Sequence, residues 1–172
     1  MENQVTSHIM KGLILGIIYI FISVIVHVFN LYEKPFINLL IYGIFFIGII
    51  YNSILFANEN NNKVEFGDIF ANSFKTTSVV IVITSFYTFL AIKLIFPEIV
   101  DITLNISRKK IEAAPNVPKE AIEQNLDFMR KYFLSLSIGL TILFLGLTGL
   151  IGSLIGAAVA KKNTNPFENT GA

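Results

Sequence analysis

Four long stretches without charge constrain this chain more than any other feature of its sequence. They cover residues 12–29, 36–57, 76–96 and 133–160. The chain has 13 basic and 12 acidic residues, and only Lys93 lies inside these stretches. About 20 helical residues cross the hydrocarbon core of a bilayer, where each backbone amide needs a partner within its own segment. The sequence therefore predicts an all-α, polytopic membrane protein with four transmembrane helices.

The composition supports this class and excludes several others. Of 172 residues, 53% are hydrophobic and 15% charged, whereas soluble domains are about a quarter charged. The net charge of +1 provides no basic surface for nucleic acid. Cysteine is absent, which excludes disulfides, thiolate metal sites and a thiol nucleophile. We expect a single membrane domain over residues 1–160, embedded in the lipid bilayer, and a flexible polar tail over 161–172.

The two shorter connections between the predicted spans differ in character. Residues 30–35 form a short loop, which makes the first two spans a tight antiparallel hairpin. The connection over 58–75 opens with an asparagine-rich run. Its later residues then place apolar side chains, among them Ile69 and Phe70, on one helical face. This pattern predicts an interfacial amphipathic helix before the third span.

The third connection, residues 98–132, is long and carries six basic and six acidic side chains. Ile122, Leu126, Met129 and Phe133 recur at helical spacing without a breaker before the fourth span. The pattern predicts that the third and fourth helices continue past the membrane as a charged extramembrane hairpin, with a kink at Pro97. Such a hairpin is suited to binding a partner protein.

The fourth span contains a repeat of small side chains at alternating three- and four-residue steps. We call this repeat the small-residue seam; its members are Ser135, Gly139, Gly146, Gly149, Ser153, Gly156 and Ala160. Small residues allow helix backbones to approach closely in lipid. Gly12 and Gly16 in the first span are expected to supply a matching notch. Packing within one four-helix bundle is the favoured interpretation, and a homo-oligomer interface is the alternative.

Polar residues near the hairpin-side ends of the spans form a candidate polar cluster of His27, Asn38, Lys93 and Glu98. An ionisable residue within a span is a functional hypothesis, although anchoring at the membrane interface is favoured for Lys93 and His27. The sequence has no paired histidines, phosphate-binding loop, hydrolase elbow or mid-membrane carboxylate. We therefore expect no catalytic residue, no metal or cofactor site and no enzymatic activity.

The segment over 65–75 carries a resemblance to a known family. It reads Glu-Phe-Gly-Asp-Ile-Phe at 65–70 and ends in Phe74-Lys75, and a small-residue-rich last span with terminal lysines follows at 149–162. With four spans and a charged stretch before the last, the chain resembles the bacterial membrane proteins of domain-of-unknown-function family 4199. The resemblance implies an uncharacterised inner-membrane protein with its termini inside, and it transfers no catalytic residues.

Three functions are consistent with these observations. The leading hypothesis is a non-enzymatic accessory or scaffold subunit of a bacterial envelope complex. The alternative is a small transporter, channel or lipid-handling protein that acts as an oligomer. It requires a cavity lined by Tyr19, Tyr42, Asn52, Thr84, Tyr87 and Thr141. The third function, a membrane enzyme, requires Lys93, His27 and Glu98 to converge.

The orientation in the bacterial inner membrane follows from two opposing signals. Lys161 and Lys162 come directly after the last span, which favours cytoplasmic N- and C-termini. A count of basic residues alone would instead place the hairpin in the cytoplasm, because the connection over 98–132 carries six of them. The hairpin charges are the solvated surface of a folded element, so we expect the termini to be cytoplasmic.

Overall fold

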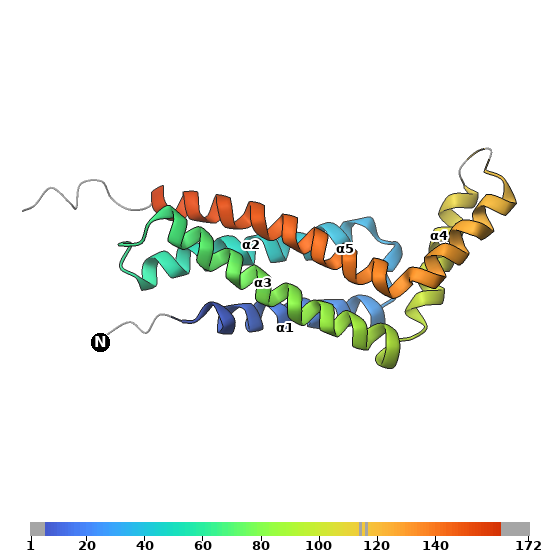
Figure 1. Ribbon diagram of the computed structural model, residues 1–172, viewed down its shortest axis with the longest axis horizontal. Coiled ribbons are helices and arrows are strands. Elements are labelled where there is room, and N and C mark those ends of the chain that lie inside the picture. Colours follow the sequence, from blue (N-terminus) through green and yellow to red (C-terminus); the bar gives the residue numbers. More distant parts are fainter. Residues whose placement is uncertain (1–5, 114, 116, 163–172) are drawn as a thin grey trace, which may run out of the picture.

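A computed structural model describes residues 6–113, 115 and 117–162, and the secondary structure of this part is all helical (Figure 1). The predicted tail lies outside the described residues from 163 onward. The elements are α1 (His8–Val28), the 3-10 turn η1 (Leu31–Glu33), α2 (Pro35–Glu59), α3 (Phe66–Leu90), the π-helical turn η2 (Ala91–Ile95), α4 (Ile99–Glu112) and α5 (Lys119–Lys162). Four of these helices are long and apolar enough to cross a bilayer, which confirms the predicted fold class.

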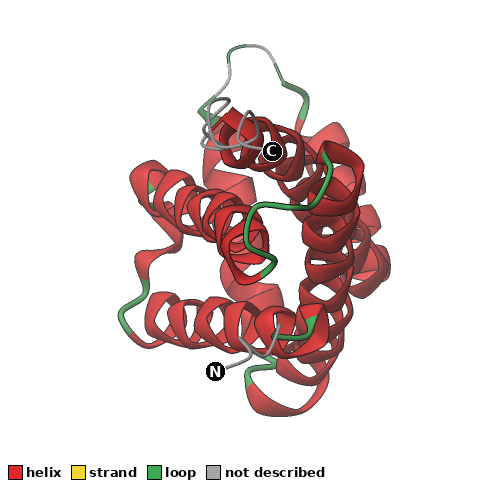
Figure 2. Cartoon of the chain, turned by 90° about the vertical axis from the view of Figure 1, so that its left-hand side faces the viewer, coloured by secondary structure: helices red, strands yellow, loops and turns green. Residues whose placement is uncertain are grey.

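The four spans form an antiparallel bundle in which α3 and α5 are the central pair. Helix α5 packs along both α2 and α3, whereas α1 packs along α3 and touches α2 only lightly. The prediction of a tight hairpin between the first two spans is therefore wrong, because their short loop brings only their ends together. Figure 2 shows the bundle along its length, with the helices side by side. Helix α1 therefore occupies a corner away from α5, and the start of α1 and the end of α5 lie at the same end of the molecule (Figure 1).

The interior of the bundle combines an apolar core with small polar side chains, whereas its exterior is strongly apolar. The fully buried polar side chains, each at most 1% exposed, are Ser53, Ser73, Thr76, Thr77, Thr84 and Ser153. The hydroxyls of Thr77 and Thr84 donate to carbonyls one turn earlier in α3, so their burial leaves no donor unpaired. Large apolar side chains point outward and are at least 60% exposed at Ile17, Phe21, Leu39, Ile47, Val82 and Leu94. Such a surface is suited to lipid.

The glycine notch of α1 faces α3. A Cβ atom added at Gly12 would lie 2.6 Å from the Cβ of Val79 and 3.0 Å from the carbonyl oxygen of Thr76. At Gly16 the added atom would meet Ile83. Glycine therefore lets the backbone of α1 approach that of α3. The predicted match between this notch and the small-residue seam of the fourth span is wrong, because α1 lies away from α5.

The small-residue seam is divided between the inside and the outside of the bundle. A Cβ atom at Gly149 would collide with Thr77 of α3, and one at Gly156 would collide with Ser53 of α2. The buried members of the seam are Gly149, Ser153, Gly156 and Ala160. The earlier members Ser135 and Gly139 are exposed, and an added Cβ at Gly139 would have no neighbour within 4 Å. The second half of the seam thus holds α5 against α2 and α3.

Residues 66–75, which were expected to form an interfacial helix of their own, are the first turns of α3. The backbone N–H of Glu65 donates to the carboxylate of Asp68 at 3.2 Å and caps the helix. Ile69 is 1% exposed and packs against alanines of α2 and α5. No proline or glycine interrupts the helix after Gly67. The apolar face of this segment is therefore partly covered by protein, although Phe66 remains exposed.

The third span breaks at Pro97. The chain passes through the π-helical turn η2 and leaves helical geometry at Phe96, where φ is −135° and ψ is 59°. A proline disfavours helical backbone at the residue before it, and its ring supplies no N–H. The prediction of one continuous third helix with a kink is wrong, since α4 is a separate helix. Helix α5 runs unbroken from the hairpin into the bundle, as the sequence predicts.

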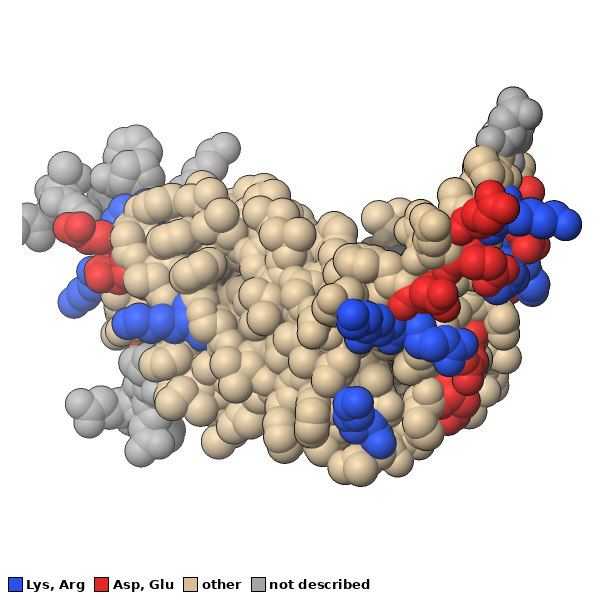
Figure 3. Space-filling model, turned by 45° about the vertical axis from the view of Figure 1, so that its right-hand side comes forward, with Lys and Arg blue, Asp and Glu red and all other residues tan. Residues whose placement is uncertain are grey.

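Helix α4 and the first turns of α5 form a hairpin with a small core of its own. Leu104, Ile122 and Leu126 are 5–6% exposed and pack together. The guanidinium of Arg108 donates to both carboxylate oxygens of Glu123 at 2.6 and 2.8 Å, which lowers the pKa of Glu123 and raises that of Arg108. The hairpin leans away from the bundle (Figure 1), and its surface carries many charged side chains (Figure 3).

Candidate ligand pocket

A cavity of about 360 Å³ lies where the hairpin meets the bundle. Helices α1, α3, α4 and α5 and the turns η1 and η2 all contribute to its walls. Two features of the fold create it. Helices α1 and α5 stand apart at opposite corners of the bundle, and the break at Pro97 directs α4 across the end of the space between them. Its volume is within the range of small-molecule sites.

The walls of this cavity are largely apolar, with a polar group at one end. The apolar side chains that line it include Ile92, Ile99, Met129, Phe133, Leu136 and Leu140. The polar side chains include Ser23, His27, Tyr32 and Tyr87. His27 and Tyr32 belong to the last turn of α1 and to η1, beside the hairpin. The cavity therefore combines an apolar body with a polar end.

The polar end is built on His27. Its Nε2 lies 3.2 Å from a carboxylate oxygen of Glu98, and its Nδ1 is hydrogen-bonded to the hydroxyl of Tyr32. A carboxylate only accepts hydrogen bonds, so Nε2 carries the proton that faces Glu98. In the neutral ring Nδ1 then accepts from the Tyr32 hydroxyl. Phe96 stacks on the imidazole, with ring centres 3.9 Å apart, and holds it in place.

Tyr32 stays protonated across the physiological range. Burial, followed by the neighbouring Tyr87 and the carboxylate of Glu98, raises the pKa of Tyr32 to about 12. Its phenol is therefore a stable hydrogen-bond donor to His27. The three side chains come from different elements, namely α1, η1 and the residue just before α4. This network joins the loop between the first two spans to the start of the hairpin.

The structure brings together two members of the predicted polar cluster, His27 and Glu98. Lys93 lies in η2, is exposed, and makes no ion pair with any residue that the structure describes. The side chain of Asn38 lies outside the described residues. Lys93 therefore does not come together with His27 and Glu98, as a membrane enzyme would require. Tyr32 and Phe96 were missed, because only the fold brings the first loop and the Pro97 break together.

The cavity that the transporter hypothesis required is not formed by its six named residues. Tyr87 lines the cavity described above. Asn52 and Thr84 are buried in the bundle interior, and the hydroxyl of Thr141 donates to the carbonyl of Ser137 within α5. Tyr19 packs against Phe45 in the core. That prediction is wrong in its residues, although a cavity exists at the hairpin end.

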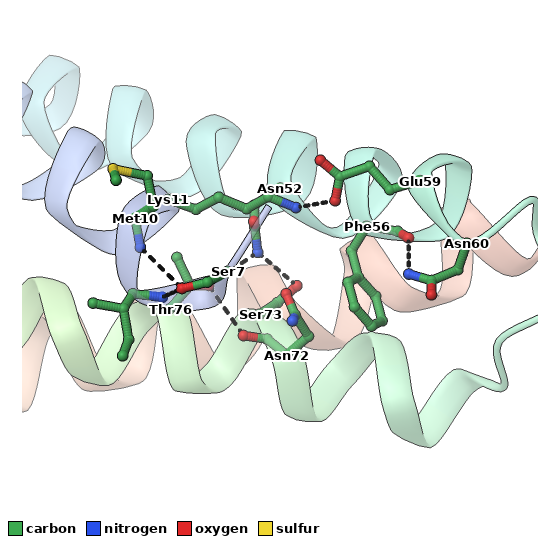
Figure 4. A network of polar contacts seen from close by, with 11 residues as sticks. Ser7, Met10, Lys11, Asn52, Phe56, Glu59, Asn60, Asn72, Ser73 and Thr76 are labelled. Atoms are coloured by element: carbon green, nitrogen blue, oxygen red, sulfur yellow. Dashed lines mark hydrogen bonds and ion pairs between the residues drawn. The ribbon is translucent and has the colours of Figure 1, made fainter. Parts of the chain in front are cut away.

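A second polar group lies at the opposite end of the bundle (Figure 4). The ammonium of Lys11 in α1 lies 2.6 Å from the carboxylate of Glu59 in α2, and these side chains are only 6% and 13% exposed. Nearby, the Asn52 amide donates to the hydroxyls of Ser73 and Thr76 at 3.1 and 3.3 Å. Each bond joins two helices. We interpret this polar group as structural.

The Lys11–Glu59 pair was missed because both residues flank the charge-free stretches. Helices α1 and α2 extend beyond those stretches, to His8 and Glu59, so their flanking charges become part of the bundle. Within the described part of the chain, no group of three or more His, Cys, Asp or Glu side chains is placed to hold a metal ion.

Four apolar spans and an apolar exterior define a multi-pass helical membrane protein. Comparison with protein-family models gives a match to the protein family of unknown function DUF4199 over residues 11–162. The chain therefore belongs to this family, as the resemblance of its sequence implied. No curated protein and no solved structure matches the chain.

Proposed function

We propose that the protein is a non-enzymatic membrane protein that binds the apolar part of a lipid-like molecule in the cavity at the hairpin end. The observation that carries this proposal is a cavity of about 360 Å³ with apolar walls and the His27 network at one end. An amphiphile has the same division between an apolar body and a polar end. The proposal keeps the lipid-handling function from the sequence analysis and places it at a different site.

The position of the cavity along the spans supports this proposal. His27 lies one residue before the end of α1, so the polar end is at the level of the lipid headgroups. Leu136 and Leu140 lie deeper, within the fourth apolar stretch. A molecule that entered from the bilayer would keep its chain in an apolar environment and its polar end near water. Binding would therefore remove little polar surface from solvent.

Filling the cavity with a large side chain is expected to prevent chain binding. The variant Leu136→Trp adds bulk at a residue that lines the cavity, whereas Leu143→Trp adds the same bulk at an outward-facing position that is 53% exposed. A long-chain alcohol bearing a diazirine is the probe, and peptide mass spectrometry locates its labels. We expect Leu136→Trp to reduce labelling of the lining residues about tenfold, equivalent to about 1.4 kcal/mol.

The control Leu143→Trp should leave that labelling unchanged. Equal labelling around the whole circumference of the bundle in the wild-type protein would contradict the proposal, because the probe would then report only the lipid-facing surface. Thermal unfolding of both variants shows whether either substitution has changed the fold rather than the cavity.

A second candidate function is an accessory or scaffold subunit of a bacterial envelope complex. It is favoured by the hairpin, which has its own core at Leu104, Ile122 and Leu126 and leans away from the bundle. The partner would be a protein whose surface complements mixed charge, since lysine, arginine, aspartate and glutamate side chains cover the hairpin (Figure 3). This function is compatible with a lipid-like molecule in the cavity beneath the hairpin.

Photocrosslinking from the hairpin in native membranes tests the scaffold function. A crosslinker at exposed Glu120 is expected to capture one defined envelope protein, whereas a crosslinker at lipid-facing Val82 should not. Reversing nearby charges with Glu123→Lys should weaken the capture, because the mixed-charge surface would no longer complement the partner. Crosslinks to lipid alone, or a capture that ignores the charge reversal, would rule this function out.

We also propose that the protein resides in the bacterial inner membrane with cytoplasmic N- and C-termini. Lys11, Lys63, Lys75 and Lys161 lie on the side of the bundle where the chain begins and α5 ends. Lysines next to a span favour the cytoplasmic side. In this orientation the hairpin and the cavity face the opposite, periplasmic side.

A further inference from the structure

A second cavity adjoins the one that receives the chain in the proposed function. It has a volume of about 470 Å³ and lies between η1 and α4. Tyr32 lines both cavities, so its side chain lies between them. Most of the side chains that line the second cavity are polar, among them Asn30, Lys34, Asn105 and Lys109. An apolar cavity therefore lies beside a polar one.

The charges around the second cavity favour an anion. Lys34 is exposed and makes no ion pair with a described residue. The ammonium of Lys109 lies 3.5 Å from the carboxylate of Glu33, and both side chains are more than half exposed. The two lysines therefore outnumber the single acid that lines the cavity. The side-chain amides of Asn30 and Asn105 add neutral hydrogen-bond donors.

The neighbouring acid Glu98 does not line the second cavity. Glu98 belongs to the polar end of the first cavity, where its carboxylate faces the imidazole of His27. The Tyr32 hydroxyl is hydrogen-bonded to the other ring nitrogen of the same imidazole, Nδ1. A headgroup in the second cavity would thus meet ammonium and amide groups on the side of Lys34 and Lys109.

We infer that the paired cavities bind a membrane lipid with an anionic phosphate headgroup, the chain in the first cavity and the phosphate beside Lys34 and Lys109. This inference rests on the proposed function, because it assumes that the first cavity receives an apolar chain. A free phosphate ion shares the headgroup chemistry, but it would leave the adjoining apolar cavity unfilled. Lysines near a membrane surface attract anionic lipid.

The test compares two lipids with identical diazirine-bearing chains, a phosphatidic acid and an uncharged diacylglycerol, with the full chain in nanodiscs. The double variant Lys34→Gln/Lys109→Gln removes both ammonium groups. The matched control Lys110→Gln removes an exposed charge next to Lys109 that does not line the cavity. We expect the double variant to lower phosphatidic acid labelling of the cavity about tenfold. Diacylglycerol labelling should be unchanged, and the control should match the wild-type protein.

The possible results separate this inference from the proposed function. If both lipids label the cavity and the double variant lowers the labelling by neither, the headgroup assignment is overturned. The proposed binding of an apolar chain is then still supported. If neither lipid labels the cavity in the wild-type protein, both the proposed function and this inference fail. Competition of phosphatidic acid by millimolar inorganic phosphate would assign the lysines to a free anion and overturn the lipid assignment. An unchanged melting temperature in the double variant excludes unfolding as the cause of lost labelling.

Discussion

Replacing Glu59 with glutamine is expected to lower the free energy of unfolding by about 3–5 kcal/mol. The substitution leaves the ammonium of Lys11, which is 6% exposed and lies 2.6 Å from the Glu59 carboxylate, without its counter-charge. An unpaired buried charge costs far more than a buried pair. The pair also joins α1 to α2, two helices that otherwise touch only lightly. Equilibrium unfolding in mixed detergent micelles, followed by helical circular dichroism, measures the change.

The double variant Lys11→Met/Glu59→Met should recover most of this loss, because it removes both charges and keeps apolar bulk. Asp101→Asn is the matched control, since Asp101 pairs with Arg130 at 2.8 Å on the exposed hairpin surface, with both side chains at least 60% exposed. We expect it to cost no more than about 1 kcal/mol. A double variant no more stable than Glu59→Gln would show that Lys11 and Glu59 are not coupled.

The variant Gly156→Leu is expected to lower the free energy of unfolding by about 3 kcal/mol. Even a single added carbon at Gly156 would collide with Ser53 and would lie 3.1 Å from the Cα of Ile50. The nearest atoms include backbone, so α5 would have to move away from α2 rather than repack a side chain. Loss of this contact weakens the packing that holds membrane helices together. The same unfolding assay applies.

Gly139→Leu is the control for this substitution, because Gly139 belongs to the same repeat but has no neighbour within 4 Å. Its stability should remain close to that of the wild-type protein. A large loss at Gly139, accompanied by a smaller particle in detergent, would instead show that the exposed part of the seam joins two copies of the chain. The pair of variants therefore separates packing within the bundle from oligomer formation.

The membrane-spanning architecture could be predicted because it depends on local properties of the sequence. A stretch without charge must form a helix in lipid wherever it lies, so the four spans follow from the placement of ions along the chain. The core of the hairpin could be predicted for the same reason. The spacing of Ile122, Leu126 and Met129 defines one helical face, and these residues pack together in the structure.

The features that escaped prediction depend on which helices become neighbours. The notch at Gly12 was assigned to the wrong partner, because glycine spacing indicates close approach without saying which helix approaches. The separate helix expected over 66–75 joined α3, since its buried face met α2 and α5. To predict the cavity, three features of the fold would have to be known together: the separation of α1 from α5, the break at Pro97, and the position of Tyr32.

The packing of α1 along α3 has a consequence for the order of assembly. Residues of the first span precede their native neighbour in the chain by the whole length of α2. When the ribosome has completed the first two spans, the glycine-lined surface of α1 has no helix to receive it. The tightest backbone contact of α1 therefore forms only after the third span enters the bilayer, so biogenesis of this protein begins with a loosely associated pair.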